Sequence, residues 1–185
     1  MNKRIACLIC YRDRPTELAL LLQSLRTSNY QDFDIFIRDD CSGTLINNYY
    51  FLTYLITRMQ QEGHKFFINR NEFCYGVSKN RQACVDDALE REYKWLLRVD
   101  DDCILEPEYM EELWDVIYQG YDLASGVTVT LMPSFKRDPK NLKIINRIIL
   151  DDEGNFVMNG DDCGMAYTDK VILPAHHFRS CALYK

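Results

Sequence analysis

Short apolar segments alternate with helix-patterned segments about four times over the first two-thirds of the chain. The apolar segments are residues 4–11, 33–37, 65–68 and 95–99. The first of them, R-I-A-C-L-I-C-Y, is almost continuously apolar, which is typical of a strand covered on both faces. This alternation predicts an α/β fold with a mostly parallel sheet and right-handed crossovers.

Two of the intervening segments have a clear helical spacing. Each begins at a proline, Pro15 or Pro107, a residue suited to the first position of a helix. Apolar residues follow each proline at positions i, i+3, i+4 and i+7, which predicts one apolar helix face. They are Leu18, Leu21, Leu22 and Leu25 in the first helix and Met110, Leu113, Trp114 and Ile117 in the second. Less regular helices are expected at about residues 45–61 and 76–91.

The last third of the chain is less regular. Residues 123–131 are strand-like, and residues 142–158 predict a hairpin with its turn at residues 151–155. Residues 165–185 fit neither a helix nor a strand pattern clearly.

Charge and hydropathy limit the classes of function. The 185 residues carry a formal net charge of −6, which argues against a nucleic-acid partner because such proteins usually present a basic surface. No apolar run approaches 18 residues, so a transmembrane segment is not expected. The apolar run near the N-terminus is short and lacks a small-residue cleavage site, so we expect no signal peptide and a cytoplasmic location.

Charged residues follow the predicted strands where a ligand would bind. In open α/β sheets the ligand lies beyond the carboxyl ends of the strands. The segments at those ends are residues 11–15, 39–42, 69–81 and 100–102, and two of them contain acidic clusters. Several carboxylates at one sheet edge repel one another unless a cation is present. Mg²⁺ or Mn²⁺ with a phosphate ligand fits such a site, because both ions prefer oxygen ligands.

Each acidic cluster also has an ordinary structural interpretation. Asp39 and Asp40 can form a β-turn with the Ser-Gly pair that follows them. Asp100, Asp101 and Asp102 can form a capping turn before the helix at Pro107. The placement of both clusters at one sheet edge is what favours a binding site.

Four segments in order resemble one enzyme family. The first two read I-A-C-L-I-C-Y-R-D-R-P and Y-Q-D-F-D-I-F-I-R-D-D-C-S, and the third, at residues 71–81, reads N-x-x-x-x-G-V-S-x-x-R. The fourth reads W-L-L-R-V-D-D-D-C-I-L-E-P and is similar to a strand-borne D-x-D signature. Together they resemble family 2 glycosyltransferases of the GT-A fold, and the resemblance covers about residues 4–118. The resemblance implies a three-layer αβα sandwich with a mostly parallel central sheet.

The resemblance implies a single domain over residues 1–185, with a nucleotide-sugar-binding half at 1–118 and an acceptor-side portion at 119–185. It also implies the site residues. Asp39 would bind the nucleotide base, Tyr11 would stack near it, and Arg81 would lie near the diphosphate or the base. Asp100 would contact the ribose or assist at the metal, and Asp102 would ligate Mn²⁺ or Mg²⁺. The remaining residues of the same nucleotide site would be Arg14, Asp40 and Asp101.

The catalytic base and the last metal ligand are less clearly indicated. Asp161 and Asp162 form the only acidic pair late enough in the chain to be the general base of the family, and the sequence around them suits a loop turn better. His177 suits a metal ligand or a contact to the donor phosphates, and equally a surface position. Family members usually extend beyond residue 185, so the chain also suits one domain of a longer enzyme.

The expected function is metal-dependent transfer of a sugar from a nucleotide sugar to a saccharide or other hydroxyl acceptor, with inversion of configuration. A UDP-linked donor is preferred, and dTDP or GDP donors stay open. One alternative is a degenerate or incomplete domain that binds nucleotide or sugar without turnover. Another is a sugar-nucleotide nucleotidyltransferase, although the loop after the first strand lacks the glycines which that class needs. A nicotinamide-binding site is not expected, because G-x-G-x-x-G is missing.

Overall fold

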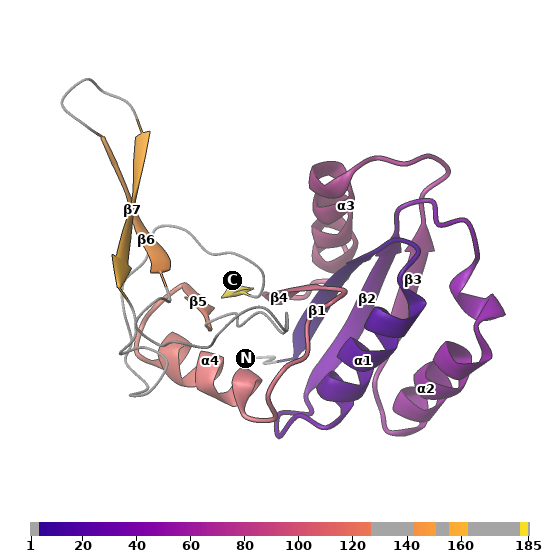
Figure 1. Ribbon diagram of the computed structural model, residues 1–185. Coiled ribbons are helices and arrows are strands. Elements are labelled where there is room, and N and C mark those ends of the chain that lie inside the picture. Colours follow the sequence, from indigo (N-terminus) through magenta and orange to yellow (C-terminus); the bar gives the residue numbers. More distant parts are fainter. Residues whose placement is uncertain (1–3, 127–142, 151–155, 163–181, 185) are drawn as a thin grey trace. The chain divides into compact units, whose positions relative to one another are not determined.

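The four alternating apolar segments lie in a six-stranded sheet with the order β3-β2-β1-β4-β8-β5 (Figure 1). The computed structural model describes residues 4–126, 143–150, 156–162 and 182–184, the middle two ranges as backbone only. The strands of this sheet are β1 (Ile5–Tyr11), β2 (Phe33–Asp39), β3 (Phe66–Arg70), β4 (Trp95–Asp100), β5 (Leu123–Ser125) and β8 (Ala182–Tyr184). β1 pairs in parallel with β2 and β4, and β2 pairs in parallel with β3. The predicted α/β class and mostly parallel sheet are therefore confirmed.

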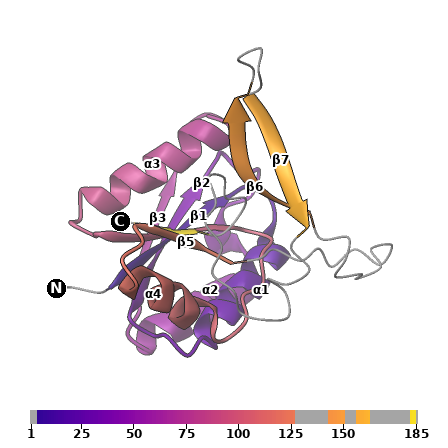
Figure 2. The same ribbon diagram turned by 90° about the vertical axis from the view of Figure 1, so that its left-hand side faces the viewer.

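Helices cover both faces of this sheet, as Figure 2 shows. The helices are α1 (Pro15–Arg26), α2 (Tyr50–Gln61), α3 (Val77–Leu89) and α4 (Tyr109–Tyr118), with a short 3-10 helix, η1, at Ile46–Asn48. The core on one face contains buried residues of α1, α2 and α4, whereas α3 contributes to the core on the other. The result is the predicted three-layer αβα sandwich.

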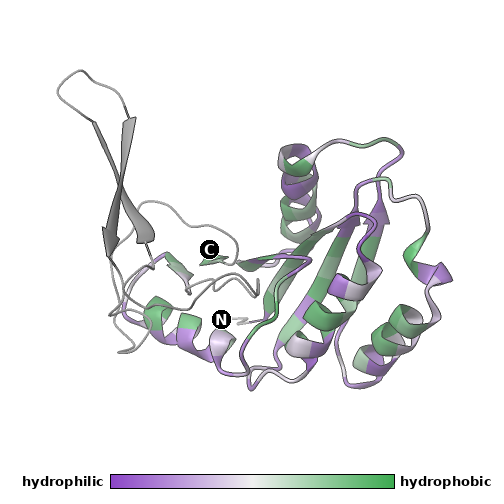
Figure 3. Ribbon diagram, in the orientation of Figure 1, coloured by the Kyte–Doolittle hydropathy of each residue, from purple (hydrophilic) through white to green (hydrophobic). Residues whose placement is uncertain are grey.

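Strand β1 contributes to both cores. Its odd-numbered residues Ile5, Cys7 and Ile9 belong to the larger core, and Ala6 and Leu8 belong to the smaller one beneath α3. Alternate residues of a strand point to opposite faces, so a strand buried on both sides must be apolar throughout. Figure 3 shows the resulting hydrophobic centre of the sheet.

The two helix faces predicted from spacing are confirmed. Every apolar residue assigned to them is buried: Leu18, Leu21, Leu22 and Leu25 of α1, and Met110, Leu113, Trp114 and Ile117 of α4. Pro15 is the first residue of α1, but α4 begins two residues after Pro107, at Tyr109. Among the described residues, no helix is both long and apolar enough to cross a bilayer.

The chain divides into two compact units, Met1–Ala124 with Ser180–Lys185, and Ser125–Arg179. In the second unit, β6 (Lys143–Leu150) and β7 (Phe156–Asp162) pair antiparallel, which confirms the predicted hairpin. β8 in the first unit pairs antiparallel with β4, and the sequence did not indicate it because three residues are too short for a clear period. The strand expected at residues 123–131 is described only as β5, and residues 127–131 lie outside the described ranges.

A buried carboxylate joins the N-terminal parts of several strands. Asp34 is fully buried, and it accepts hydrogen bonds from the Arg4 guanidinium, at 2.5 and 2.6 Å, and from the backbone N–H of Lys65. The Tyr93 hydroxyl donates a further hydrogen bond. Burial opposes ionisation of Asp34, but the hydrogen bond from Arg4 and the other donors outweigh it and lower the pKa of Asp34.

We expect the substitution Asp34→Asn to lower the free energy of unfolding by about 3 kcal/mol at neutral pH, because it breaks a buried and fully hydrogen-bonded ion pair. The folded-state pKa of Asp34 lies below its unfolded value, so its contribution is complete above about pH 3.9 and is lost as the pH falls through the folded-state pKa. Urea unfolding at neutral and acidic pH measures both effects. Asp32→Asn is the control, because Asp32 also pairs with Arg4 but is half exposed, and its effect should be much smaller.

Candidate functional site

The sheet pairing brings the predicted acidic residues to one edge. Tyr11, the last residue of β1, lies opposite Asp39, the last residue of β2. On the other side of β1, Cys10 lies opposite Asp100, the last residue of β4. Because these strands are parallel, all three end at the same edge, where α/β sheets bind ligands. The structure thus brings Asp39 and Asp40 to the same edge as Asp100, Asp101 and Asp102.

Asp39 is held rigidly under this edge. It is 2% exposed, and its Oδ1 accepts hydrogen bonds from the backbone N–H and the hydroxyl of Ser42, at 2.9 and 2.5 Å. Its Oδ2 lies 3.6 Å from Nε of Arg70. The Asp39 side chain therefore closes this loop onto Ser42, and the β-turn that the sequence suggested stays a prediction. The oxygen nearer Arg70, Oδ2, is the one not bound to Ser42.

Asp40 organises the loop between β3 and α3. Its Oδ1 accepts hydrogen bonds from the Asn71 amide and the Tyr75 N–H, and its Oδ2 accepts from the Gly76 N–H and the Cys74 thiol. Burial opposes ionisation, but these donors outweigh it and lower the pKa of Asp40. Gly76 has a φ of +76°, a conformation that favours glycine. In this structure Asp40 positions the loop, and a nucleotide contact for it stays a prediction.

Two buried asparagines support the same loop. The amide of Asn71 donates to Oδ1 of Asn80 at 2.8 Å, and the amide of Asn80 donates to the backbone oxygen of Arg38. The Arg38 guanidinium donates in turn to Oδ1 of Asn71 and to Asp87. Sequence reasoning gave these asparagines no role of their own. A buried amide group needs hydrogen-bond partners, so a network around these asparagines is expected once the fold shows that they are buried.

The Asp triplet is paired with two arginines. Arg81 of α3 contacts Oδ1 of Asp100 through its Nη2 at 2.7 Å. Nη1 of Arg14, just before α1, contacts Oδ1 of Asp101 at 3.2 Å and Oδ2 of Asp102 at 2.9 Å. Asp101 is 8% exposed, whereas half of the Asp102 side chain is exposed. Burial raises the pKa of Asp101 to about 6, with Asp102 and Asp100 adding to the rise and Arg14 opposing it.

Tyr11 is placed differently from the expectation. It is 1% exposed, and its side chain belongs to the larger core with Ile9 and Leu22. Its odd position in β1 directs it to the face that α1 and α2 cover. Stacking on a base would require this side chain to leave the core, and burial also raises the pKa of its hydroxyl.

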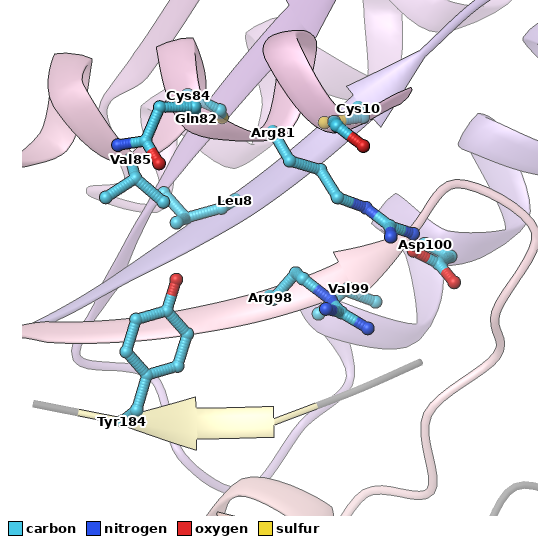
Figure 4. A pocket seen from close by; sticks show the side chains of 11 residues that line it. Leu8, Cys10, Arg81, Gln82, Cys84, Val85, Arg98, Val99, Asp100 and Tyr184 are labelled. Carbon is cyan, nitrogen blue, oxygen red and sulfur yellow. Dashed lines mark hydrogen bonds and ion pairs between the residues drawn. The ribbon is translucent and has the colours of Figure 1, made fainter. Parts of the chain in front are cut away.

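A hollow of about 200 Å³ lies beside this edge, between α3 and strands β4 and β8 (Figure 4). The Arg81–Asp100 pair lies at one end of it, and the ring of Tyr184 extends from β8 toward Leu8 and Val85 at the other. The hollow is smaller than the roughly 300–1,000 Å³ of typical small-molecule sites, so it can hold only part of a ligand the size of a nucleotide sugar.

The remaining predicted site residues lie in the last third of the chain. Asp161 and Asp162 are the last two residues of β7, opposite Ile144 and Lys143 of β6. The interpretation of this pair as a loop turn is therefore wrong, because the antiparallel pairing extends to Asp162. Their role as a base stays a prediction. His177 lies outside the described residues.

The chain belongs to glycosyl transferase family 2, whose family model matches residues 6–174. The match covers the sheet edge with both acidic clusters. It supports the predicted GT-A fold and the classification of the chain as a glycosyltransferase. No curated protein matches the chain in sequence.

Solved structures of similar fold include S. aureus TarS and a mannosyltransferase. S. aureus TarS 1-349 is 18% identical to this chain, and the match covers 78% of this chain and 42% of TarS 1-349 with a TM-score of 0.53. For its complex with UDP-GlcNAc the identity is 19%, and the match covers 71% of this chain and 37% of that one, also with a TM-score of 0.53. Mannosyltransferase PcManGT from Pyrobaculum calidifontis, in complex with GDP-Man and Mn²⁺, is 10% identical over 68% and 36%, with a TM-score of 0.54. At these identities the likeness shows the fold. The chain spans about two fifths of the length of these structures.

We expect Asp40→Asn to loosen the loop of residues 71–76. An asparagine side chain has one acceptor oxygen where Asp40 uses two, so the N–H groups of Tyr75 and Gly76 cannot both keep their partners. Hydrogen–deuterium exchange of these amides should become about tenfold faster or more, since an opening cost reduced by 1.4 kcal/mol corresponds to tenfold. Glu72→Gln is the control, because it removes the same charge from an exposed side chain in the same loop. Unchanged exchange at residues 75 and 76 would contradict this role of Asp40.

Proposed function

We propose that this domain transfers a sugar from a nucleotide-diphosphate sugar, UDP-linked by preference, to a hydroxyl acceptor with the help of a divalent metal. The observation that carries the proposal is the convergence of Asp39, Asp100, Asp101 and Asp102 at the carboxyl-terminal edge of a GT-A sheet. Family membership supports sugar transfer as the reaction. The similar structures with bound UDP-GlcNAc and GDP-Man support a nucleotide-sugar donor and leave the base open.

The carboxylates at this edge have the right chemistry for Mn²⁺ or Mg²⁺. Both ions take oxygen ligands, and the exposed carboxylate of Asp102 and its neighbour Asp100 would hold the ion. The described residues contain no group of three His, Cys, Asp or Glu side chains arranged to hold an ion. Phosphate and water oxygens would therefore complete its coordination. When bound, the ion neutralises the charge that develops on the nucleoside diphosphate as it leaves.

The chain's own residues divide the remaining tasks. Arg81 and Arg14 lie beside the Asp triplet, where guanidinium groups can bind phosphate oxygens in a bidentate manner. Asp39 is fixed by Ser42 through one oxygen, so its other oxygen is the one suited to accept a hydrogen bond from the base. Because the Asp39 carboxylate is already fixed, binding of the nucleotide sugar does not have to order it.

The acceptor side involves the acidic pair at the end of β7. Asp161 or Asp162 would take the proton of the acceptor hydroxyl as a general base, and this role predicts inversion at the anomeric carbon. We also propose a cytoplasmic site of action, since donor and metal are both available there. A folded domain that binds a donor but transfers nothing would instead match the degenerate alternative.

Calorimetric titration of UDP, GDP and dTDP, each with Mn²⁺ and with EDTA, tests the donor site. We expect binding of one nucleotide, UDP first, that Mn²⁺ strengthens at least tenfold. Asp102→Asn should remove this metal dependence, because it takes away the charge of an exposed ligand without disturbing the core. Asp115→Asn serves as the matched control, because Asp115 is an exposed carboxylate on α4.

The outcomes separate the alternatives. A folded protein that binds none of the three nucleotides would overturn the donor site. Binding without metal dependence would overturn the role of the metal. The nucleotide that binds then identifies the sugar donors to assay, and NMR of the anomeric proton of the product reports inversion or retention.

A further inference from the structure

The Asp triplet is paired within the protein with two arginines that differ in how they bind. Arg81 contacts one carboxylate, that of Asp100. A single nitrogen of Arg14, Nη1, lies within 3.2 Å of Asp101 and 2.9 Å of Asp102. Arg14 therefore lies between the two carboxylates, one of which is the proposed metal ligand. A divalent ion on Asp102 would compete with this guanidinium for the same oxygen.

The position of Arg14 is set by the loop that precedes α1. Asp13 has a φ of +51°, its N–H donates to the Ser42 hydroxyl at 3.0 Å, and its Oδ1 accepts from the Gly43 N–H at 2.7 Å. Pro15 then begins α1 directly after Arg14. The backbone on both sides of Arg14 is thus anchored, whereas half of its side chain is exposed and able to change partner.

We propose that Arg14 acts as an internal cation that holds Asp101 and Asp102 in the metal-free protein and moves to the donor phosphates when metal and nucleotide bind. This inference rests on the proposed function. A guanidinium carries one positive charge and repels a divalent ion nearby, so Arg14 weakens the binding of the metal alone. A diphosphate offers Arg14 a bidentate partner and so removes this competition. Arg14 thereby makes the metal and the nucleoside diphosphate bind cooperatively.

The test measures Mn²⁺ alone, UDP alone and the two together. Free Mn²⁺ is counted by electron paramagnetic resonance and UDP binding by calorimetry, in the wild-type protein, Arg14→Met and Arg14→Lys. Arg12→Met is the matched control, because the Arg12 side chain is equally exposed and loses the same charge but lies beside Asp13, at 3.8 Å, and Cys74. Only the backbone N–H of Arg12, which the substitution keeps, bonds to the triplet, at Asp101. Thermal unfolding checks that each variant is folded.

We expect Arg14→Met to bind Mn²⁺ alone about tenfold more tightly, since a nearby positive charge is removed. The factor by which Mn²⁺ strengthens UDP binding should fall by a similar amount. Arg14→Lys keeps the charge, so its affinity for Mn²⁺ alone should stay within about twofold of the wild type. Arg12→Met should match the wild type in both measurements.

Two results would overturn the inference, and they differ in what they leave standing. If Mn²⁺ strengthens UDP binding in the wild type but Arg14→Met leaves the affinity for Mn²⁺ alone unchanged, the role of Arg14 is wrong and the proposed function stands. If the wild type binds UDP and Mn²⁺ independently or not at all, the metal-dependent donor site and the role of Arg14 fail together.

Discussion

Strand β1 is the element on which the rest of the structure depends. It pairs in parallel with β2 on one side and with β4 on the other, and nearly all of its side chains are buried. A parallel sheet buried on both faces gains its stability from continuous apolar strands and from crossover helices that cover them. Because β2 and β4 both align with β1, their last residues, Asp39 and Asp100, reach the same edge.

The carboxylates at this edge are held in two physically different ways. Asp39 and Asp40 are buried and bound by hydroxyl, amide and backbone N–H donors that belong to fixed turns. Asp100 and Asp102 are more exposed and are paired with arginine side chains. Hydrogen bonds from the backbone cannot be exchanged without local unfolding, whereas a partly exposed ion pair contributes little and exchanges readily. The first pair therefore shapes the site, and the second can exchange its partners more readily.

Family membership and geometry support the same class of enzyme from different directions. The family match covers residues 6–174 as sequence, and the structures of TarS and PcManGT share the fold at 10–19% identity. A shared fold does not specify donor or acceptor, so those depend on the site itself. Here the acidic edge, the two arginines and the adjoining hollow supply oxygen ligands, phosphate-binding groups and limited space. These features suit the diphosphate and sugar of a donor.

The sequence by itself determined strands β1 to β4, the apolar faces of α1 and α4, and the strand ends at which the acidic residues stand. These features follow from local periodicity, which each segment carries independently of its neighbours. Only the tertiary structure decided that Tyr11 is buried, that Asp40 binds the loop of residues 71–76, and that Arg14 reaches the Asp triplet. The last contact joins residues 87 positions apart, and β8 pairs with β4 over a similar separation. Such contacts depend on the order of strands in the sheet and on competition among donors for each buried carboxylate, which no local pattern records.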